Sequence, residues 1–212
     1  MSNPFDFNTL ITSRGKQLEY LISLPESREE GGTYPTLFAL PPGDQNREMA
    51  MVYNHWLRYF QEQGWVVCCP VAPEGELFFR GSERYLPRIM EHIEYQVKLE
   101  GGKFYLFGVS NGGISAFRVA TLNPERFHSI TVLPGWPKPA DDKRLDKLLN
   151  LPINFLVGEM DSRWREKSEL FFNRISKMGG DSILELIPGE DHFAFHSFPV
   201  EKLIQVIQRN CR

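Results

Sequence analysis

Apolar residues follow two alternating patterns along this chain: short continuous runs, and longer stretches in which they recur every three or four positions. Continuous apolar runs are typical of strands buried on both faces of a sheet. They predict strands at residues 17–24, 36–40, 65–70, 104–109, 129–133, 153–157 and 183–187. The helical spacing predicts helices at residues 49–63, 82–99, 111–122, 164–178 and 199–209. Residues 1–16 and 26–35 are predicted to be irregular or loop, since they are polar or rich in Gly and Pro.

Strands that alternate with helices indicate an α/β fold, built on a mostly parallel sheet with helices on both faces. No repeat, low-complexity tract or linker interrupts residues 1–212, so we expect a single domain. In sheets of this kind, ligands bind beyond the carboxyl ends of the strands. The candidate functional residues are therefore those that directly follow the predicted strands.

Ser110 stands where the strand at residues 104–109 turns sharply into a helix. It lies between Gly108 and Gly112 in a G-x-S-x-G pattern, and a tight strand-to-helix turn requires such small neighbours. The turn exposes the serine Oγ and points the first helical amides toward charge that develops on a substrate. Ser110 is therefore predicted to be a nucleophile, with the backbone N–H of Asn111 as one oxyanion donor.

Two other strand ends carry the groups that a nucleophilic serine needs. Asp161 follows the strand at residues 153–157, and His192 follows the strand at residues 183–187. A serine requires a general base within hydrogen-bond reach, and an imidazole base requires a carboxylate that fixes its tautomer. His192 is the predicted base and Asp161 the predicted acid.

Each of these assignments has competitors. The chain has 5 histidines, and His192 is preferred over His196 because of its place at a strand end. The others are interpreted as structural or solvated residues: His55 and His92 within helices, and His128 before a strand. Glu159 and Asp191 remain alternative acids, although Asp191 is expected to shape the turn before His192.

The chain order Ser, Asp, His, with each residue after a successive strand of an α/β sheet, resembles that of the α/β-hydrolase family. The resemblance runs from about residue 17 to residue 209 and looks closest to the small carboxylesterase, dienelactone-hydrolase and polyester-depolymerase-like branches. In those branches a Gly-x-x-Asp and a Gly-x-x-His segment flank the penultimate helix. Here they read Gly158-Glu-Met-Asp161 and Gly189-Glu-Asp-His192. The resemblance implies Ser110 as nucleophile, His192 as base and Asp161 as acid.

The second oxyanion donor is expected in the loop after residues 36–40, where the sequence departs from the common His-Gly pattern of the family. It reads Leu40-Pro-Pro-Gly-Asp44. The prolines have no N–H to donate. If Pro42 takes the place of the histidine, the donor is the backbone N–H of Asp44, with Gly43 allowing close approach. A register shift of two residues would leave one donor, and the alternative interpretation is a plain Pro-Gly turn.

Apolar side chains follow several strands and could converge beside Ser110. The candidates for substrate binding are Leu77, Phe78, Trp136 and Phe193. They would suit an ester with an apolar acyl or aromatic part, and the alternative interpretation is ordinary packing. The stretch between residues 133 and 153 is too short for a large helical lid, so we expect an open site that favours small soluble substrates.

At 212 residues with 42% apolar content, the chain is long enough to bury a substantial core. Its net charge of −3 and the lack of dense Lys/Arg runs argue against a nucleic-acid surface. The first residues have no apolar signal region and no stretch reaches the length of a membrane span, so we expect a cytoplasmic protein. Cys68 and Cys69 are interpreted as buried or incidental thiols, and no metal or cofactor is expected.

These observations predict a carboxylesterase-like serine hydrolase that acts on esters or thioesters of small molecules through an acyl-enzyme. A serine peptidase of the same fold is the runner-up. A non-catalytic ligand receptor or scaffold is the alternative from a different class. The complete Ser, His and Asp set favours the enzyme. The sequence leaves the oligomeric state open, a homodimer included.

Overall fold

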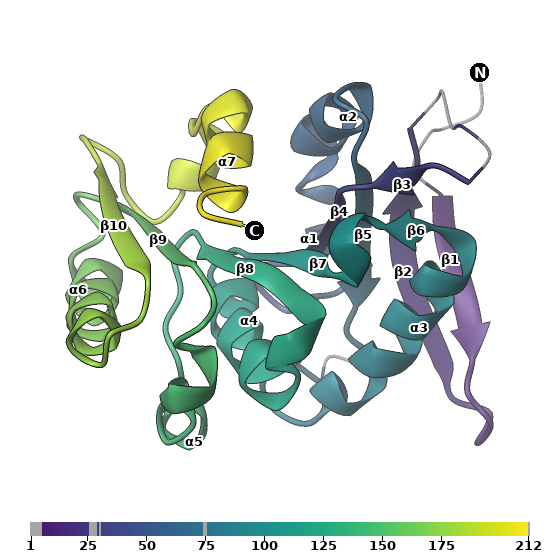
Figure 1. The fold of residues 1–212 in the computed structure, drawn as a ribbon, viewed down its shortest axis with the longest axis horizontal. Helices are drawn as coiled ribbons and strands as arrows, with labels where there is room; N and C mark the ends of the chain where they lie inside the picture. Colours follow the sequence, from purple (N-terminus) through teal and green to yellow (C-terminus); the bar gives the residue numbers. More distant parts are fainter. Residues whose placement is uncertain (1–5, 26–28, 30, 74–75, 212) are drawn as a thin grey trace.

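The computed structural model describes residues 6–25, 29, 31–73 and 76–211, apart from the side chains at positions 6, 54, 55 and 57. Its strands are β1 (Asp6–Ile11), β2 (Gln17–Ser23), β3 (Thr33–Tyr34), β4 (Thr36–Leu40), β5 (Val66–Val71), β6 (Lys98–Leu99), β7 (Phe104–Gly108), β8 (Phe127–Val132), β9 (Ile153–Gly158) and β10 (Ser182–Ile187). Its helices are α1 (Arg47–Met51), α2 (Asn54–Glu62), α3 (Leu86–Gln96), α4 (Asn111–Leu122), α5 (Pro139–Asp142), α6 (Ser162–Lys177) and α7 (Val200–Ile207). The main sheet has the order β1-β2-β5-β4-β7-β8-β9-β10, and β3 pairs with β6 in a second, small sheet (Figure 1).

The strands predicted from continuous apolar runs form the main sheet. From β5 across to β10 neighbouring strands run parallel, while β2 and β1 add antiparallel pairs at one edge. Every residue of β4, β5, β7 and β9 is buried, which is why each of them is a continuous apolar run rather than an alternating one. The predicted α/β fold with a mostly parallel sheet is confirmed.

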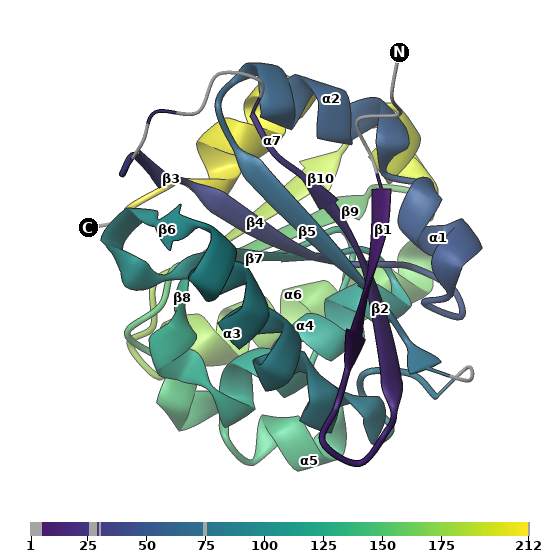
Figure 2. The ribbon, with the colours of Figure 1, turned by 90° about the vertical axis from the view of Figure 1, so that its right-hand side faces the viewer.

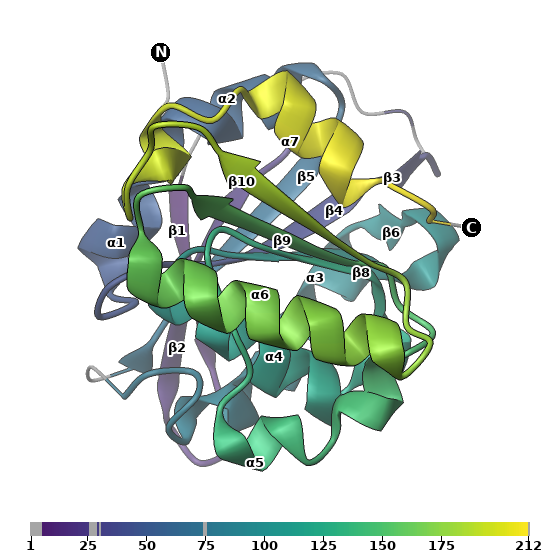
Figure 3. The same ribbon diagram turned by 90° about the vertical axis from the view of Figure 1, so that its left-hand side faces the viewer.

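Helices cover both faces of the sheet. Figures 2 and 3 show α1, α2 and α7 on one face and α3, α4 and α6 on the other. Adjacent residues of one strand therefore enter different cores: Leu37 of β4 shares a core with Trp56 and Leu203, whereas Phe38 shares the other with Phe117. Burial on both faces fixes the register of the strands, and so the places where they end. Among the described residues, no helix combines the length and apolar character that crossing a bilayer needs.

Strand β1 corrects the expectation that residues 1–16 are irregular; residues 1–5 of that stretch lie outside the described residues. β1 is the edge strand of the sheet and pairs with β2 alone. Phe7 and Leu10 pack against the cores, while Ile11 is exposed. The strand was missed because polar residues interrupt its apolar ones, as in an edge strand that is buried only in part, so no continuous run marks it.

Helix boundaries also differ from those that apolar spacing predicts. The predicted helix at residues 49–63 is divided into α1 and α2 at residues 52–53. The predicted helix at residues 82–99 begins as a 3-10 turn and ends before Val97, whose extended backbone leads into β6. β6 pairs with β3, which lies inside the stretch at residues 26–35 predicted as loop. Apolar spacing continues across these breaks, so it does not detect them.

The cysteines are free thiols. Cys68 and Cys69 lie in β5 and are fully buried, as interpreted from the sequence. Burial raises the pKa of both thiols, so neither supplies a thiolate nucleophile at neutral pH. Cys211 is partly buried, and burial raises the pKa of its thiol too.

Candidate active site

Ser110 sits at the turn between β7 and α4, in a backbone conformation that L-residues rarely adopt. Its φ is 55° and its ψ is −116°. Such a conformation costs on the order of 1–3 kcal/mol and persists only where the surroundings impose it. The Ser110 N–H donates to the carbonyl of Pro134 (3.0 Å), and the Ser110 carbonyl accepts from the N–H of Ile114 (3.0 Å). These bonds hold the turn that presents the Oγ.

Close packing around this turn requires glycine. A Cβ at Gly112 would lie 2.0 Å from the carbonyl oxygen of Leu40, and one at Gly108 would lie 2.2 Å from the carbonyl oxygen of Gly112. Both separations are far shorter than a van der Waals contact. The first turn of α4 therefore rests directly on the backbone of β4 and β7, which only small residues allow.

His192 and Asp161 meet Ser110 at the carboxyl edge of the sheet. The Oγ of Ser110 lies 2.9 Å from Nε2 of His192, and Nδ1 of the same ring lies 2.6 Å from Oδ2 of Asp161. The Asp161 side chain is 10% exposed and that of His192 is 31% exposed. The imidazole is thus held between a shielded carboxylate and the hydroxyl, with part of the ring open to a ligand.

The loops after β9 and β10 are joined to each other by their backbones. The N–H of Met160 donates to the carbonyl of Glu190 (2.8 Å). Gly158 allows this approach, since a Cβ there would lie 2.2 Å from the carbonyl oxygen of Asp191. The separation of imidazole and carboxylate is therefore set by the parallel pairing of β9 with β10.

The alternative acids have other partners. The Asp191 carboxylate accepts from the N–H of Phe193 (2.8 Å), an arrangement that shapes the turn as expected for this residue. The Glu159 carboxylate accepts from the N–H of Gly189 (3.1 Å). Asp161 is the acid that the structure brings to the imidazole.

The other histidines lie in other surroundings. The structure shows His92 packed against Tyr20, His128 bonded to the carbonyl of Glu100, and His196 packed against Phe195. The side chain of His55 lies outside the described residues. It is the ring of His192 that the structure brings to Ser110.

The loop after β4 lies beside the start of α4. The side-chain amide of Asn111 donates to the carbonyl of Gly43 (2.9 Å), and the N–H of Gln45 closes a tight turn on the carbonyl of Pro42 (3.0 Å). Asp44 lies inside that turn. The backbone N–H of Asn111 occupies the first position of α4, where an N–H has no partner within the helix. Both predicted oxyanion donors thus belong to segments tied to the Ser110 turn.

Gln45 is a residue of this site that sequence analysis missed. It is fully buried, and its φ of 55° is unusual for a residue other than glycine. Its side-chain amide donates to the carbonyl of Pro41 (3.1 Å) and to the hydroxyl of Ser115 (2.9 Å). Its side-chain oxygen accepts from the N–H of Phe78 (2.7 Å), and its backbone carbonyl accepts from the N–H of Ala72 (2.7 Å).

Gln45 therefore fastens three segments to one another: the loop after β4, the loop after β5, and α4. These segments carry the predicted second oxyanion donor, several apolar candidates for substrate binding, and Ser110 at the helix start. No local signal marks this residue, because glutamine is mostly exposed in proteins and its burial here depends on partners distant along the chain.

An apolar surface stands beside the imidazole of His192. Its small buried cluster consists of Leu77, Phe79 and Ile114, with Trp136 and Trp164 packed against it. The ring centroids of Trp136 and Trp164 are 4.1 Å apart, and the Trp164 ring lies 4.7 Å from that of His192. We call Phe79, Trp136 and Trp164 the aromatic wall.

Of the residues predicted to bind substrate, Leu77 and Trp136 belong to this surface and Phe78 does not. The Phe78 ring is 1% exposed and lies in the core on the α3 side of the sheet. Neighbouring side chains in this segment point in opposite directions, so Phe79 takes the place predicted for Phe78. Phe193 is 60% exposed, with its ring 5.9 Å from the imidazole.

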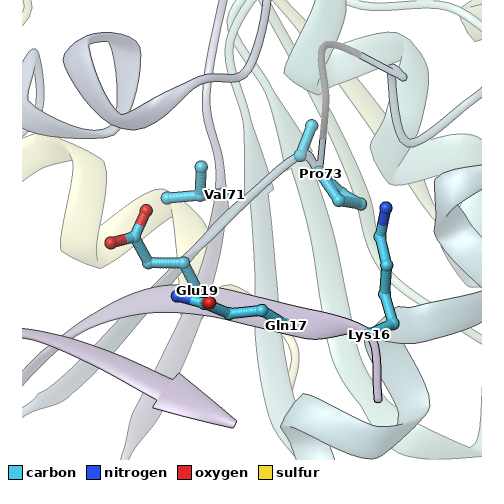
Figure 4. Close-up of a pocket in the computed structure, with 6 residues that line it drawn as sticks. Lys16, Gln17, Glu19, Val71 and Pro73 are labelled. Carbon is cyan, nitrogen blue, oxygen red and sulfur yellow. The ribbon is translucent and has the colours of Figure 1, made fainter. Parts of the chain in front are cut away.

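A hollow of about 290 Å³ lies at the end of β5, two strands away from β7 in the sheet (Figure 4). It is lined by Lys16, Gln17, Glu19, Val71, Ala72 and Pro73. Ser110, Asp161 and His192 are not among these lining residues, so the hollow is separate from the Ser110 site. Within the described part of the chain, no three His, Cys, Asp or Glu side chains gather as a metal site requires.

No protein-family model and no curated protein matches the sequence, but solved structures match the fold. A thermostable esterase matches with a TM-score of 0.75 at 16% identity, over 97% of this chain and 60% of that one. An S-formylglutathione hydrolase from Agrobacterium tumefaciens gives 0.75 at 17% identity, over 96% and 94% of the two chains. A fluorophosphonate-binding serine hydrolase from Staphylococcus aureus gives 0.76 at 14% identity, over 97% and 99%. The chain has the α/β-hydrolase fold.

At these identities the likeness is one of fold. In an α/β-hydrolase fold, a sharp strand-to-helix turn presents the nucleophile, and the acid and the base follow later in the chain. Ser110 stands at such a turn, with Asp161 after β9 and His192 after β10.

Replacing Gln45 by leucine would leave the carbonyl of Pro41 and the N–H of Phe78 without their partner. We expect Gln45→Leu to lower the free energy of unfolding by about 2–4 kcal/mol, because each unsatisfied buried group costs about 1–3 kcal/mol. Amide hydrogen exchange should become faster in residues 41–46 and 77–79, which the glutamine holds together.

Asn154→Leu is the matched control. Asn154 is an equally buried amide, on β9, that bonds the hydroxyl of Thr131 and the carbonyl of Val206. Asn154→Leu should lower the free energy of unfolding to a similar extent and leave the rate of amide hydrogen exchange in residues 41–46 and 77–79 unchanged. Equal exchange in these segments for both variants would show that Gln45 does not hold them.

Proposed function

We propose that the protein is a serine hydrolase that cleaves carboxylic esters or thioesters of small molecules through an acyl-enzyme. The observation that carries the proposal is the chain of contacts from the Ser110 hydroxyl through the His192 imidazole to the Asp161 carboxylate, at 2.9 and 2.6 Å. A serine hydroxyl is a weak nucleophile unless a positioned base takes its proton. The likeness of fold to esterases and serine hydrolases supports the proposal by analogy.

In the proposed first step, the Oγ of Ser110 forms a bond to the carbonyl carbon while neutral His192 takes the hydroxyl proton at Nε2. The π electrons of the carbonyl move to its oxygen, and Asp161 stabilises the imidazolium through Nδ1. When the tetrahedral intermediate collapses, the bond to the alcohol or thiol breaks, and Nε2–H protonates that leaving group. The acyl group remains on Oγ.

Water completes the proposed cycle. His192 takes a proton from water as the water oxygen bonds to the acyl carbon, and a second tetrahedral intermediate forms. Its collapse breaks the bond to Oγ, which receives the proton back from Nε2. One ester and one water thus give one carboxylic acid and one alcohol, and the side chains return to their starting state.

The negative charge on each intermediate requires donors that are already in place. We propose the backbone N–H groups of Asn111 and Asp44. The N–H of Asn111 begins α4, where the helix dipole adds partial positive charge. That of Asp44 belongs to the turn that the Asn111 amide and Gln45 hold in position.

The proposed substrates are small esters with an apolar or aromatic part. The aromatic wall and Leu77 offer apolar surface next to the imidazole. Between β8 and β9 the chain, described throughout, forms only α5 and a 3-10 turn. These short elements support the proposal of an open site without a large helical lid.

A fluorophosphonate probe should phosphonylate the wild-type protein, because an activated serine oxygen attacks the electrophilic phosphorus and displaces fluoride. Ser110→Ala should form no adduct, and Ser176→Ala, which changes an exposed serine at the end of α6, should react like wild type. Intact-mass spectrometry measures the adduct, and p-nitrophenyl butyrate hydrolysis measures turnover. A wild-type protein that stays unlabelled and inactive would favour a ligand receptor instead.

Proline and alanine at position 44 separate the backbone donor from the side chain. Asp44→Pro removes the N–H, so kcat should fall by about 10²–10³-fold, the usual effect of losing one oxyanion donor. Asp44→Ala keeps the N–H and should stay within a few-fold of wild type. Kinetics on p-nitrophenyl butyrate, with thermal unfolding as a check on folding, measure both. An equal loss in the two variants would place the donor elsewhere.

A further inference from the structure

The ammonium group of Lys138 lies over the aromatic wall. Its Nζ is 5.5 Å from the centroid of the Phe79 ring and 5.8 Å from that of the Trp136 ring. A second cation, the guanidinium of Arg80, lies 5.4 Å from the Phe79 centroid. Positive charge is thus gathered at the wall, in a protein whose net charge is −3.

Among the described residues, no carboxylate pairs with the Lys138 ammonium. The acids of the adjoining helix α5 are held by arginines: Asp141 by Arg118 (2.7 Å) and Arg144 (3.1 Å), and Asp142 by Arg174 (2.6 Å). The backbone of Lys138 is fixed as well, because its carbonyl accepts from the N–H groups of both aspartates (2.8 Å each). The ammonium is therefore available to an anion from outside the protein.

A series of ring contacts connects Lys138 with the imidazole of His192. The imidazole of His192 lies against the ring of Trp164, which lies against Trp136, and the Lys138 ammonium lies over Trp136. A molecule placed along this surface, with its ester carbonyl at the serine, would carry its far end to the ammonium.

We propose that Lys138 is a specificity residue that binds an anionic group at the far end of the substrate. The preferred substrates are then esters or thioesters with an apolar or aromatic middle part and a terminal carboxylate or similar anion. This inference rests on the proposed hydrolase function and names the substrate class within it. Arg80 adds to the positive potential that attracts the anion.

The arrangement suits an amphipathic anion. The ammonium of Lys138 lies over apolar rings and keeps its N–H donors for a partner. A hydrogen bond from an ammonium to a carboxylate is charge-assisted, and the rings exclude water from one side of it, which strengthens it. A neutral ligand of the same shape would bury the same apolar part and leave the ammonium unmatched. Preference for the anion therefore comes from charge and not from shape.

Substrates that differ in charge alone provide the test. One pair carries the charge on the acyl side: the mono-p-nitrophenyl ester of adipic acid and its primary amide. The other carries it on the alcohol side: 4-acetoxyphenylacetic acid and its primary amide. We expect wild-type kcat/KM to favour the carboxylate by about tenfold in at least one pair. The preference should shrink as ionic strength rises.

Lys138→Met removes the charge and keeps most of the side chain, and Lys143→Met removes an exposed lysine of the same segment. The carboxylate-to-amide ratio of kcat/KM should fall about tenfold in the first variant and keep its wild-type value in the second. An equal fall of this ratio in both variants would show that the preference comes from the general positive potential and not from Lys138. An unchanged ratio in Lys138→Met would mean that Lys138 binds no anion. Either result overturns the proposal.

A binding measurement separates this proposal from the proposed catalysis. In Ser110→Ala, tryptophan fluorescence can report 4-phenylbutyrate and 4-phenylbutanamide, since Trp136 and Trp164 belong to the wall. Tighter binding of the carboxylate that is lost in Ser110→Ala/Lys138→Met supports the anion site even if the wild type hydrolyses no ester. Equal Kd values for the two ligands overturn it even if hydrolysis is rapid.

Discussion

The close approach of α4 to the backbone of β4 and β7 sets the position of the Ser110 turn, and the other residues of the site are arranged around that turn. Gly112 lies so near the carbonyl of Leu40 that no side chain fits between them, and Ser110 takes a φ of 55° as a result. The strain, on the order of 1–3 kcal/mol, is offset by the hydrogen bonds of the turn, each about 0.5–1.5 kcal/mol, and by the burial of α4 against the sheet. This one contact determines where the Oγ lies and where the Asn111 amide points.

The other groups come to this turn from other strand ends, and the loops that carry them are bonded to one another. Pairing of β9 with β10 sets Asp161 against His192, and Gln45 joins the loops after β4 and β5 to α4. The aromatic wall extends from the imidazole to Lys138. A substrate would therefore meet groups that are already oriented before it binds, the condition under which electrostatic stabilisation is most effective.

The fold was predictable where a single physical rule dominates. Continuous apolar runs marked the buried strands, and the parallel sheet placed Ser110, Asp161 and His192 at one edge, where their side chains do meet. The edge strand β1 was not predicted because part of it faces solvent. The break between α1 and α2 was not predicted because apolar spacing continues across it. Gln45, and the choice of Phe79 over Phe78, depend on contacts between segments distant in sequence. No local pattern encodes such contacts.

Ser110, His192 and Asp161 are proposed to act as one unit, and the additivity of their substitutions tests this most directly. Residual kcat on p-nitrophenyl butyrate would be measured for Ser110→Ala and for the triple variant Ser110→Ala/His192→Ala/Asp161→Ala. If the three residues act as one unit, Ser110→Ala alone lowers kcat by about 10⁴–10⁶-fold. The two further substitutions then change the remaining kcat by less than about threefold. The result that would contradict this is a triple variant that is slower than Ser110→Ala by the product of the losses in kcat that His192→Ala and Asp161→Ala each cause alone.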